Sequence, residues 1–396
     1  MVNYSFFRFF SPVILALVWL MAGAALLQPA YAATLTVTNT NDSGPGSLRA
    51  ALVAATAGSV IQFNLPANST ITLTGGELVV NAPVTIDGAT ATNLTISGNN
   101  AGRAFLASTA LTITALTIRD GNASGGNGGG IASTGAMTLT LTNVKVISNT
   151  ATEGGGVWAN GAIRLNGGLF QNNISVNGLG GGLFTSGSLT LTGTQFIGNR
   201  AQKGGGLYQT GNGAGQIINA LFVRNTASGG SALDLNSTAS VAVMHSTIIG
   251  PKVAVPTVND LKDIGVYPQT RFDTFTGVVA AGGSVGITNT IVASYSIGIS
   301  YTIGTAWENY NLFSGNDVNL TGTITSGGNS FSGNPMFANP TGNDYHLGPG
   351  SAAINAGVNL GVLTDFEGEP RPSGGGFDIG FDEYPFQSVY LPLIRR

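Results

Sequence analysis

The stretch EGGGVWANGAIRLNGGLFQNN, residues 153–173, decides the fold because its pattern recurs along the chain. Each copy places glycines before an aliphatic residue, continues with alternating apolar and polar residues, and closes on an asparagine. The aliphatic position falls at Ile131, Val157, Leu183, Leu207 and Leu233, and the closing position at Asn149, Asn173, Asn199 and Asn225. Successive aliphatic positions are 26, 26, 24 and 26 residues apart. Repeats of this length indicate a solenoid whose units bury their apolar faces against their neighbours.

Within a unit the apolar residues recur every second position, as Ile163 and Leu165 do on either side of Arg164. This period excludes helical solenoids. Short strands separated by Gly and Asn corners fit a parallel β-helix, because both residues tolerate a left-handed backbone. The sequence therefore predicts an all-β, single-stranded parallel β-helix. The closing asparagines are interpreted as an internal ladder, with a ligand role as the alternative.

The N-terminus suggests an exported protein, and the composition limits its partners and its means of stabilisation. Residues 1–32 combine Arg8, an apolar run and a small-residue site at Ala30-Tyr31-Ala32, which predicts a cleaved signal peptide; an uncleaved membrane anchor is the alternative. No later segment is apolar enough to span a membrane. Charged residues make up 8% of the chain and the net charge is -3, which argues against a nucleic-acid partner. The chain has no cysteine, so it must be stable without disulfides.

The remaining segments follow from the same pattern. Residues 33–60 are expected to form an N-terminal cap, since Ser47 begins a short helical stretch that closes at Gly58. Regular repeats cover about 122–250. Three prolines and several charges predict a protruding, irregular loop at 250–283. Closing coils are expected over 284–384. The tail at 385–396 is interpreted as an unstructured or edge-packed terminus, with a sorting signal as the alternative.

Three motifs resemble known secreted bacterial proteins. NDSGPGSLRAAL (41–52) resembles the opening of right-handed parallel β-helix repeat proteins, without the cysteine that often precedes SLR. The GGG-aliphatic and Phe-x-x-Asn columns resemble polymorphic outer membrane proteins, although Val146 replaces the phenylalanine in the first unit. Residues 334–357 and 365–384 resemble the closing segment of the choice-of-anchor Q group. The resemblance covers most of 33–384 and implies a secreted or surface-exposed, pectate-lyase-like solenoid of right-handed coils, without implying an activity.

The sequence contains few residues that could catalyse the reactions typical of β-helix enzymes. Glycosidases need paired carboxylates, and lyases need an acidic calcium site with a basic residue. Between residues 121 and 233 the only acid is Glu153. The loop offers possible calcium ligands and bases, and a solvated loop is the alternative interpretation. These loop residues are Asp260, Asp263, Asp273, Lys262 and Arg271.

A second acidic region lies near the C-terminus around Arg371. An internal arginine–carboxylate lock is the default interpretation, and a bound calcium ion is the alternative. The candidate calcium ligands are Asp365, Glu367, Asp378 and Asp382. No other cofactor is expected. Because the chain has only two histidines, His245 and His346, no zinc site of the usual ligand type is expected.

A column of aromatic residues carries the binding hypothesis. If the aliphatic residues point inward, strand alternation turns the next residues outward. That column reads Ala132, Trp158, Phe184, Tyr208 and Asp234, and the nearby polar candidates are Arg164, Lys203 and Gln209. An exposed aromatic stripe would suit a polysaccharide or cell-envelope glycan; alternatively the rings simply stabilise the ladder. The sequence thus favours a secreted or cell-surface glycan-binding, adhesion or envelope protein, with an extracellular polysaccharide lyase or glycoside hydrolase as the alternative.

Overall fold

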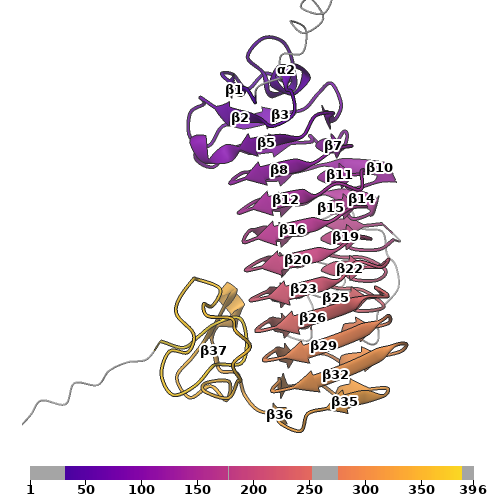
Figure 1. The fold of residues 1–396 in the computed structure, drawn as a ribbon, viewed down its shortest axis with the longest axis vertical. Helices are drawn as coiled ribbons and strands as arrows, with labels where there is room; N and C mark the ends of the chain where they lie inside the picture. The colour runs from indigo at the N-terminus through magenta and orange to yellow at the C-terminus, as the bar shows by residue number, and fades with distance from the viewer. Residues whose placement is uncertain (1–31, 177, 252–274, 386–396) are drawn as a thin grey trace, which may run out of the picture.

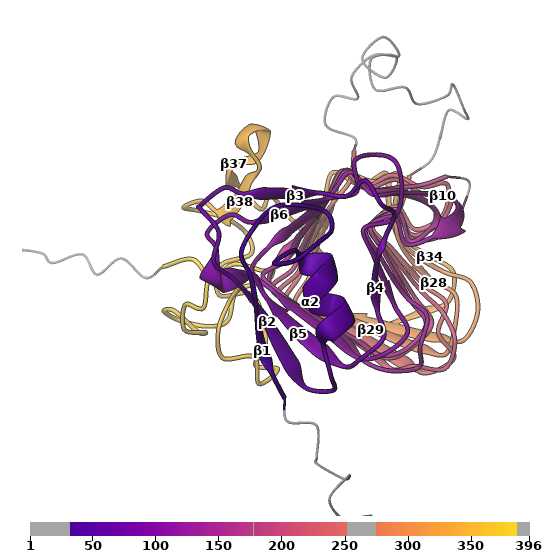
Figure 2. The same cartoon turned by 90° about the horizontal axis from the view of Figure 1, so that it is seen from above.

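The computed structural model describes residues 32–176, 178–251 and 275–385 of the 396-residue chain, which forms a parallel β-helix (Figure 1). The chain passes through the same sheets once per coil, and neighbouring strands in each large sheet are one coil apart in sequence. Seen from the N-terminal end, the chain turns clockwise as it recedes, so the coils are right-handed (Figure 2). The predicted fold class is confirmed.

Sheet A has twelve strands among the described residues. In order, they are β1 (Thr34–Val37), β2 (Ser59–Phe63), β5 (Val84–Asp87), β8 (Leu111–Thr114), β12 (Leu139–Thr142), β16 (Ile163–Asn166), β20 (Leu189–Thr192), β23 (Gly215–Ile218), β26 (Ser240–Met244), β29 (Ser284–Thr288), β32 (Thr305–Asn309) and β35 (Ile324–Ser326).

Sheets B and C complete each coil. The strands of sheet B are β3 (Thr70–Thr72), β6 (Thr95–Ser97), β9 (Thr117–Arg119), β13 (Lys145–Ile147), β17 (Leu169–Gln171), β21 (Gln195–Ile197), β24 (Leu221–Val223), β27 (Thr247–Ile249), β30 (Ile291–Ala293), β33 (Leu312–Ser314) and β36 (Phe331–Ser332). The strands of sheet C are β4 (Leu78–Val80), β7 (Phe105–Ala107), β11 (Ile131–Ser133), β15 (Val157–Ala159), β19 (Leu183–Thr185), β22 (Leu207–Gln209), β25 (Leu233–Leu235), β28 (Thr276–Ala280), β31 (Ile297–Tyr301) and β34 (Val318–Thr321). A small sheet at one corner contains β10 (Asn122–Asn127), β14 (Thr150–Glu153) and β18 (Ile174–Ser175).

The core sits inside the coils, as the repeat pattern predicts. The aliphatic residues that follow the glycines stand in register in sheet C and are fully buried: Ile131, Val157, Leu183, Leu207 and Leu233. In sheet B, Phe196 stacks between Phe170 and Phe222, with ring centroids 4.7 and 4.8 Å apart. Burying one such side chain stabilises the fold by about 1.5–3 kcal/mol, so each coil depends on its neighbours.

The asparagine ladder is confirmed. The side chain of each asparagine bonds to the next along the stack: Asn149 to Asn173 at 3.0 Å, Asn173 to Asn199 at 2.9 Å, and Asn199 to Asn225 at 2.9 Å. All four residues are fully buried. The ladder therefore satisfies polar groups in the interior, where unpaired ones would be costly.

Helix α2 (Leu48–Ala54) covers the first coil, where Figure 2 shows it over the opening. The Ser47 hydroxyl accepts a hydrogen bond from the backbone N–H of Ala50, as expected of an N-cap. The helix ends at Ala54, before Gly58, because Ala55 already has an extended backbone. None of the helices in the described part of the chain is long and apolar enough to span a bilayer.

Parts of the predicted segments lie outside the described residues: 1–31, 252–274 and 386–396. The predicted signal peptide, the centre of the loop and the C-terminal tail fall there, so those assignments stay predictions. The loop assignment extends too far, since Thr276–Ala280 forms strand β28. Val278 of β28 pairs with Leu233 and is fully buried, so the residue belongs to the inward column of sheet C.

The C-terminal segment does not form closing coils up to residue 384. The last coil ends with β36, and residues 333–385 form a lateral lobe beside the β-helix, yellow in Figure 1. The lobe contains β37 (Phe337–Asn339), the short helix η3 (Pro340–Gly342) and β38 (Asp344–Leu347). Its Tyr345 and Phe381 pack on apolar residues of sheet B, namely Ile197, Leu221, Val223 and Ile249. These sheet B residues would otherwise face water, which explains why the segment covers a side of the solenoid.

Candidate functional site

The predicted aromatic column exists in sheet C. Trp158 and Phe184 pair in register, with ring centroids 5.7 Å apart and planes within 5° of parallel. Phe184 and Tyr208 repeat this arrangement at 5.7 Å and 13°. Asp234 occupies the same position one coil later. The stacking that the repeat predicts is therefore confirmed.

The expected exposure of this column is wrong. Phe184 is 7% exposed and Tyr208 6%, and Trp158 is only partly exposed. Glycine corners pack against the bases of the rings, since a Cβ on Gly204 would lie 2.7 Å from the Tyr208 Cβ. Burial supports the interpretation that the rings stabilise the ladder. Their role in glycan binding stays an untested prediction.

The three polar candidates do not converge on the rings. Gln209 is fully buried and its Nε2 donates to the carbonyl of Gly213 at 2.9 Å. Gln209 lies two residues after Leu207 in the same strand, so the alternation of side chains already predicts that it points inward. Arg164 is exposed but belongs to strand β16 of sheet A. Lys203 is exposed and interacts electrostatically with Asp234.

Asp234 is an acidic residue in an unfavourable place. Its side chain ends the aromatic column with 4% exposure. Burial raises its pKa to about 6, and the positive charge of Lys203 opposes that rise. At neutral pH the ionised Asp234 carboxylate therefore lowers the stability of the folded protein.

In the C-terminal acidic region the arginine–carboxylate lock is confirmed. Arg371 Nη1 donates to Glu383 Oε2 at 2.8 Å, and both side chains are fully buried. Asp378 accepts backbone N–H groups of Asn355 and Tyr384 at 2.6 and 2.7 Å. These contacts hold the turns of the lateral lobe together.

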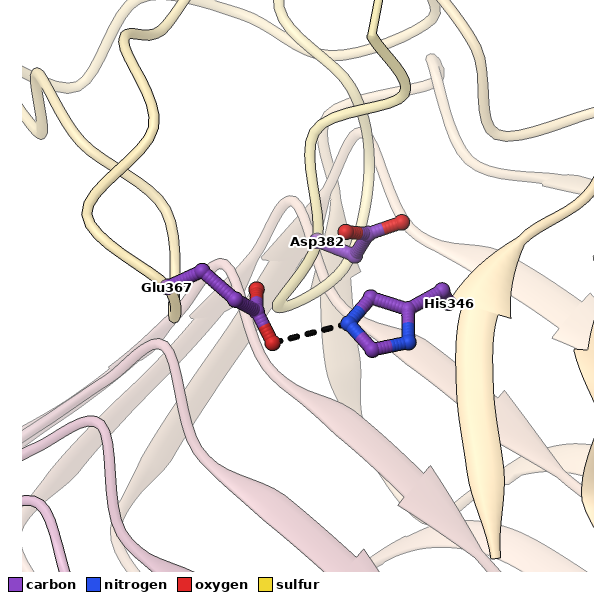
Figure 3. A group of neighbouring side chains, drawn as sticks. All are labelled: His346, Glu367 and Asp382. Atoms are coloured by element: carbon purple, nitrogen blue, oxygen red, sulfur yellow. Dashed lines mark hydrogen bonds and ion pairs between the residues drawn. The ribbon is translucent and has the colours of Figure 1, made fainter. Parts of the chain in front are cut away.

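The proposed calcium ligands divide into two groups. Asp365 accepts the backbone N–H groups of Glu367, Glu369 and Glu383, so its oxygens serve the chain fold, as those of Asp378 do. Glu367 and Asp382 instead approach His346, and the ligand atoms of these three residues lie within 4.8 Å of one another (Figure 3). The sequence analysis named Glu367 and Asp382 as calcium ligands but did not place His346 beside them.

His346 is the centre of this second group. Its Nε2 lies 2.8 Å from Glu367 Oε1, and its Nδ1 lies 2.5 Å from Asp344 Oδ1. Partial burial lowers the pKa of His346, but the hydrogen bonds to Asp344 and Glu367 and the charge of Asp382 outweigh it and raise the pKa to about 9. Burial raises the pKa of Asp382 to about 6. The spacing of Asp344 and His346, two residues apart in one strand, could have predicted their contact but not the approach of Glu367 and Asp382.

Trp307 is the second residue that the sequence analysis missed. It lies in β32 of sheet A, is 45% exposed and pairs in register with Gly286. A Cβ on Gly286 would lie 2.2 Å from the indole Cζ2, so the ring rests directly over this glycine. Other coils carry threonines at this outward position, among them Thr140 and Thr190. The sequence could have predicted this contact, because Gly286 precedes the outward-facing Trp307 by one coil at the same position.

The loop acids and bases of the enzyme interpretation lie outside the described residues: Asp260, Asp263, Asp273, Lys262 and Arg271. A shallow hollow of about 300 Å³ is lined by Leu94, Leu116 and Lys145 among others, and its lining has no acidic side chain.

Comparisons with known proteins concern the fold alone. No protein-family model matches the chain, and no curated protein matches it. A search of solved structures finds the crystal structure of pectate lyase Pel9A, with a TM-score of 0.44 and 14% identity over 88% of this chain and 96% of that chain. The resemblance to polymorphic outer membrane proteins and to the choice-of-anchor Q group stays a prediction.

Proposed function

We propose that this protein is a secreted or cell-surface, non-catalytic glycan-binding protein that contacts polysaccharide or cell-envelope glycan through sheet A at Trp307. The observation that carries the proposal is the position of the Trp307 indole, which lies over Gly286 and is 45% exposed. The buried column of sheet C offers no comparable open ring surface.

The indole packs against the backbone of the neighbouring coil at Gly286. Gly286 has no side chain, so the ring fills the space that a threonine occupies in other coils, an arrangement known to stabilise glycines in sheets. Despite this contact the Trp307 residue is still 45% exposed. A large amphipathic ring held in place loses little conformational entropy on binding.

The surroundings of Trp307 suit a hydroxylated ligand. Thr325 pairs with Trp307 one coil further on and is exposed. Asn309, two residues along β32, accepts a hydrogen bond from Asn329 Nδ2 at 3.0 Å. The apolar face of a sugar ring can stack on the indole while its hydroxyl groups bond to such side chains. Thr325, Asn309 and Asn329 are uncharged, which favours neutral sugar units.

The test compares glycan binding by the intact chain with that of three variants. Trp307→Ala should weaken binding at least tenfold on a glycan array and in titration with the best glycan. Gly286→Val should weaken it similarly by displacing the ring, with a shift in tryptophan fluorescence. Val318→Ala is the matched control, since Val318 is also 45% exposed but belongs to sheet C. Unchanged binding by Trp307→Ala would overturn the proposal.

The enzymatic alternative makes a separate prediction. A polysaccharide lyase would release unsaturated products from acidic polysaccharides, and a hydrolase would release reducing ends. We expect neither product on prolonged incubation with a polysaccharide panel. Formation of either product by the wild-type chain would replace the non-catalytic assignment with the enzymatic one.

A further inference from the structure

We propose that His346, Glu367 and Asp382 form a binding site for a divalent transition-metal ion, with zinc as the best match, on the lateral lobe. The three ligand atoms lie within 4.8 Å of one another, although the residues come from separate segments (Figure 3). One imidazole nitrogen and two carboxylates are a ligand set that zinc accepts, with bonds of about 2.0–2.2 Å.

Asp382 supplies the observation that points to a ligand. Its side chain is 4% exposed, and its Oδ2 accepts the backbone N–H of Leu347 at 2.6 Å. Its carboxylate makes no other hydrogen bond among the described residues, and its Oδ1 does not belong to the fully buried side-chain atoms that lack a partner. The carboxylate therefore keeps an accessible oxygen although the residue as a whole is buried. A cation held beside His346 and Glu367 can bond to this carboxylate.

His346 is oriented as a metal ligand would be. Asp344 holds Nδ1 at 2.5 Å, which leaves Nε2 directed at Glu367. A carboxylate on the far nitrogen of a ligating histidine fixes the ring and makes Nε2 more basic. On binding, the metal would take the place of the Nε2 proton, which leaves to solvent, and the 2.8 Å contact to Glu367 would widen to fit the ion between the two atoms.

The charge of the group also favours a cation. Three carboxylates, Asp344, Glu367 and Asp382, surround one imidazole, so the group is negative even when His346 is protonated. Calcium fits less well, because it takes six to eight oxygen ligands whereas this group offers a nitrogen. The exposure of His346 and Glu367 leaves a coordination position open to water.

Metal binding would tie together three parts of the lobe: strand β38, the turn around residue 367, and the segment that carries Asp382. The site is separate from Trp307, so a glycan-binding defect does not bear on it. Any ion that binds the folded lobe more strongly than the unfolded chain must raise its stability.

The experiment uses the full chain, freed of metal by a chelator and titrated with Zn²⁺, Mn²⁺ or Ca²⁺ in a calorimeter. We expect one Zn²⁺ per chain and a rise in melting temperature. His346→Gln should lower Zn²⁺ affinity at least a hundredfold, and Asp344→Asn by 10- to 100-fold through loss of the orienting contact. Glu369→Gln, an exposed acid in the same turn, is the matched control.

Co²⁺ absorption gives a second readout that does not depend on stability. Visible bands typical of a nitrogen- and oxygen-ligated ion should be present in the wild type and in Glu369→Gln, and absent from His346→Gln. Asp382→Asn is kept as an additional variant only, because Asp382 also supports Leu347. The proposal is overturned if the wild type binds no Zn²⁺, or if His346→Gln binds Zn²⁺ or Co²⁺ as the wild type does.

Discussion

Asn173 and Asn199 are one coil apart and bond twice: the backbone N–H and the side-chain Nδ2 of Asn173 both donate to Oδ1 of Asn199, at 3.0 and 2.9 Å. The second Nδ2 hydrogen of Asn173 reaches the carbonyl of Val146 at 2.8 Å. Because the amide is fully satisfied, a buried polar column can stand beside the phenylalanine stack without a penalty. The coils are thereby fixed in register as well as packed.

Replacing Asn199 with leucine should destabilise the protein by about 3 kcal/mol or more, because it leaves several buried partners of Asn199 without a hydrogen bond. Urea unfolding, followed by circular dichroism, measures the change. Asn166→Ala is the control, since Asn166 is exposed on sheet A, and should stay within about 0.5 kcal/mol. Equal stability of the two variants would contradict the structural role of the ladder.

Asp234→Asn should stabilise the protein at neutral pH. The folded pKa of Asp234 is raised to about 6 from 3.8, so its favourable contribution is complete below about pH 3.8 and is lost as pH rises through about 6. The variant should therefore exceed the wild type by about 1–3 kcal/mol at pH 7 and lose that advantage near pH 4. Removing the opposing charge with Lys203→Met should enlarge the difference. A stability gap independent of pH would refute the assignment.

Arg371→Met should be strongly destabilising, by about 3–5 kcal/mol, because it leaves the buried Glu383 charge without its partner. Adding Glu383→Gln to that variant should recover part of the loss. The pair of Arg119 and Asp120, whose side chains are 54% and 20% exposed, provides the comparison: Arg119→Met should cost less than about 1 kcal/mol. Denaturant unfolding at pH 7 separates the two cases, and similar losses at both sites would speak against a buried lock.

The repeat pattern predicts the interior well because a solenoid repeats the same contact each coil. The inward column of Val157 and Leu183, the ladder at Asn173 and the cap at Ser47 all depend on neighbours one coil away or closer. The spacing of glycines and asparagines in the sequence therefore already records the register. Alternation also placed Gln209 inside, although the residue was grouped with the outer face.

Contacts outside the repeat were not predictable in this way. His346 meets Glu367 and Asp382 because the lobe brings distant segments together, and no period relates those positions. The predicted exposure of Phe184 was wrong for a different reason. Alternation sets the direction of a side chain, whereas its burial also depends on neighbouring groups such as the glycine corners. Trp307 differs from both, since its significance lies in the absent side chain of Gly286.

The lateral lobe alters how the molecule would respond to a pulling force. A plain solenoid can peel coil by coil from an end, because each coil holds only its neighbours. Here Tyr345 and Phe381 rest on residues of three consecutive coils, represented by Ile197, Val223 and Ile249. Those coils cannot separate until the lobe detaches, so a single-molecule stretching trace should show one large rupture for this region instead of a staircase of small steps. The lobe thus acts as a splint across the coils it covers.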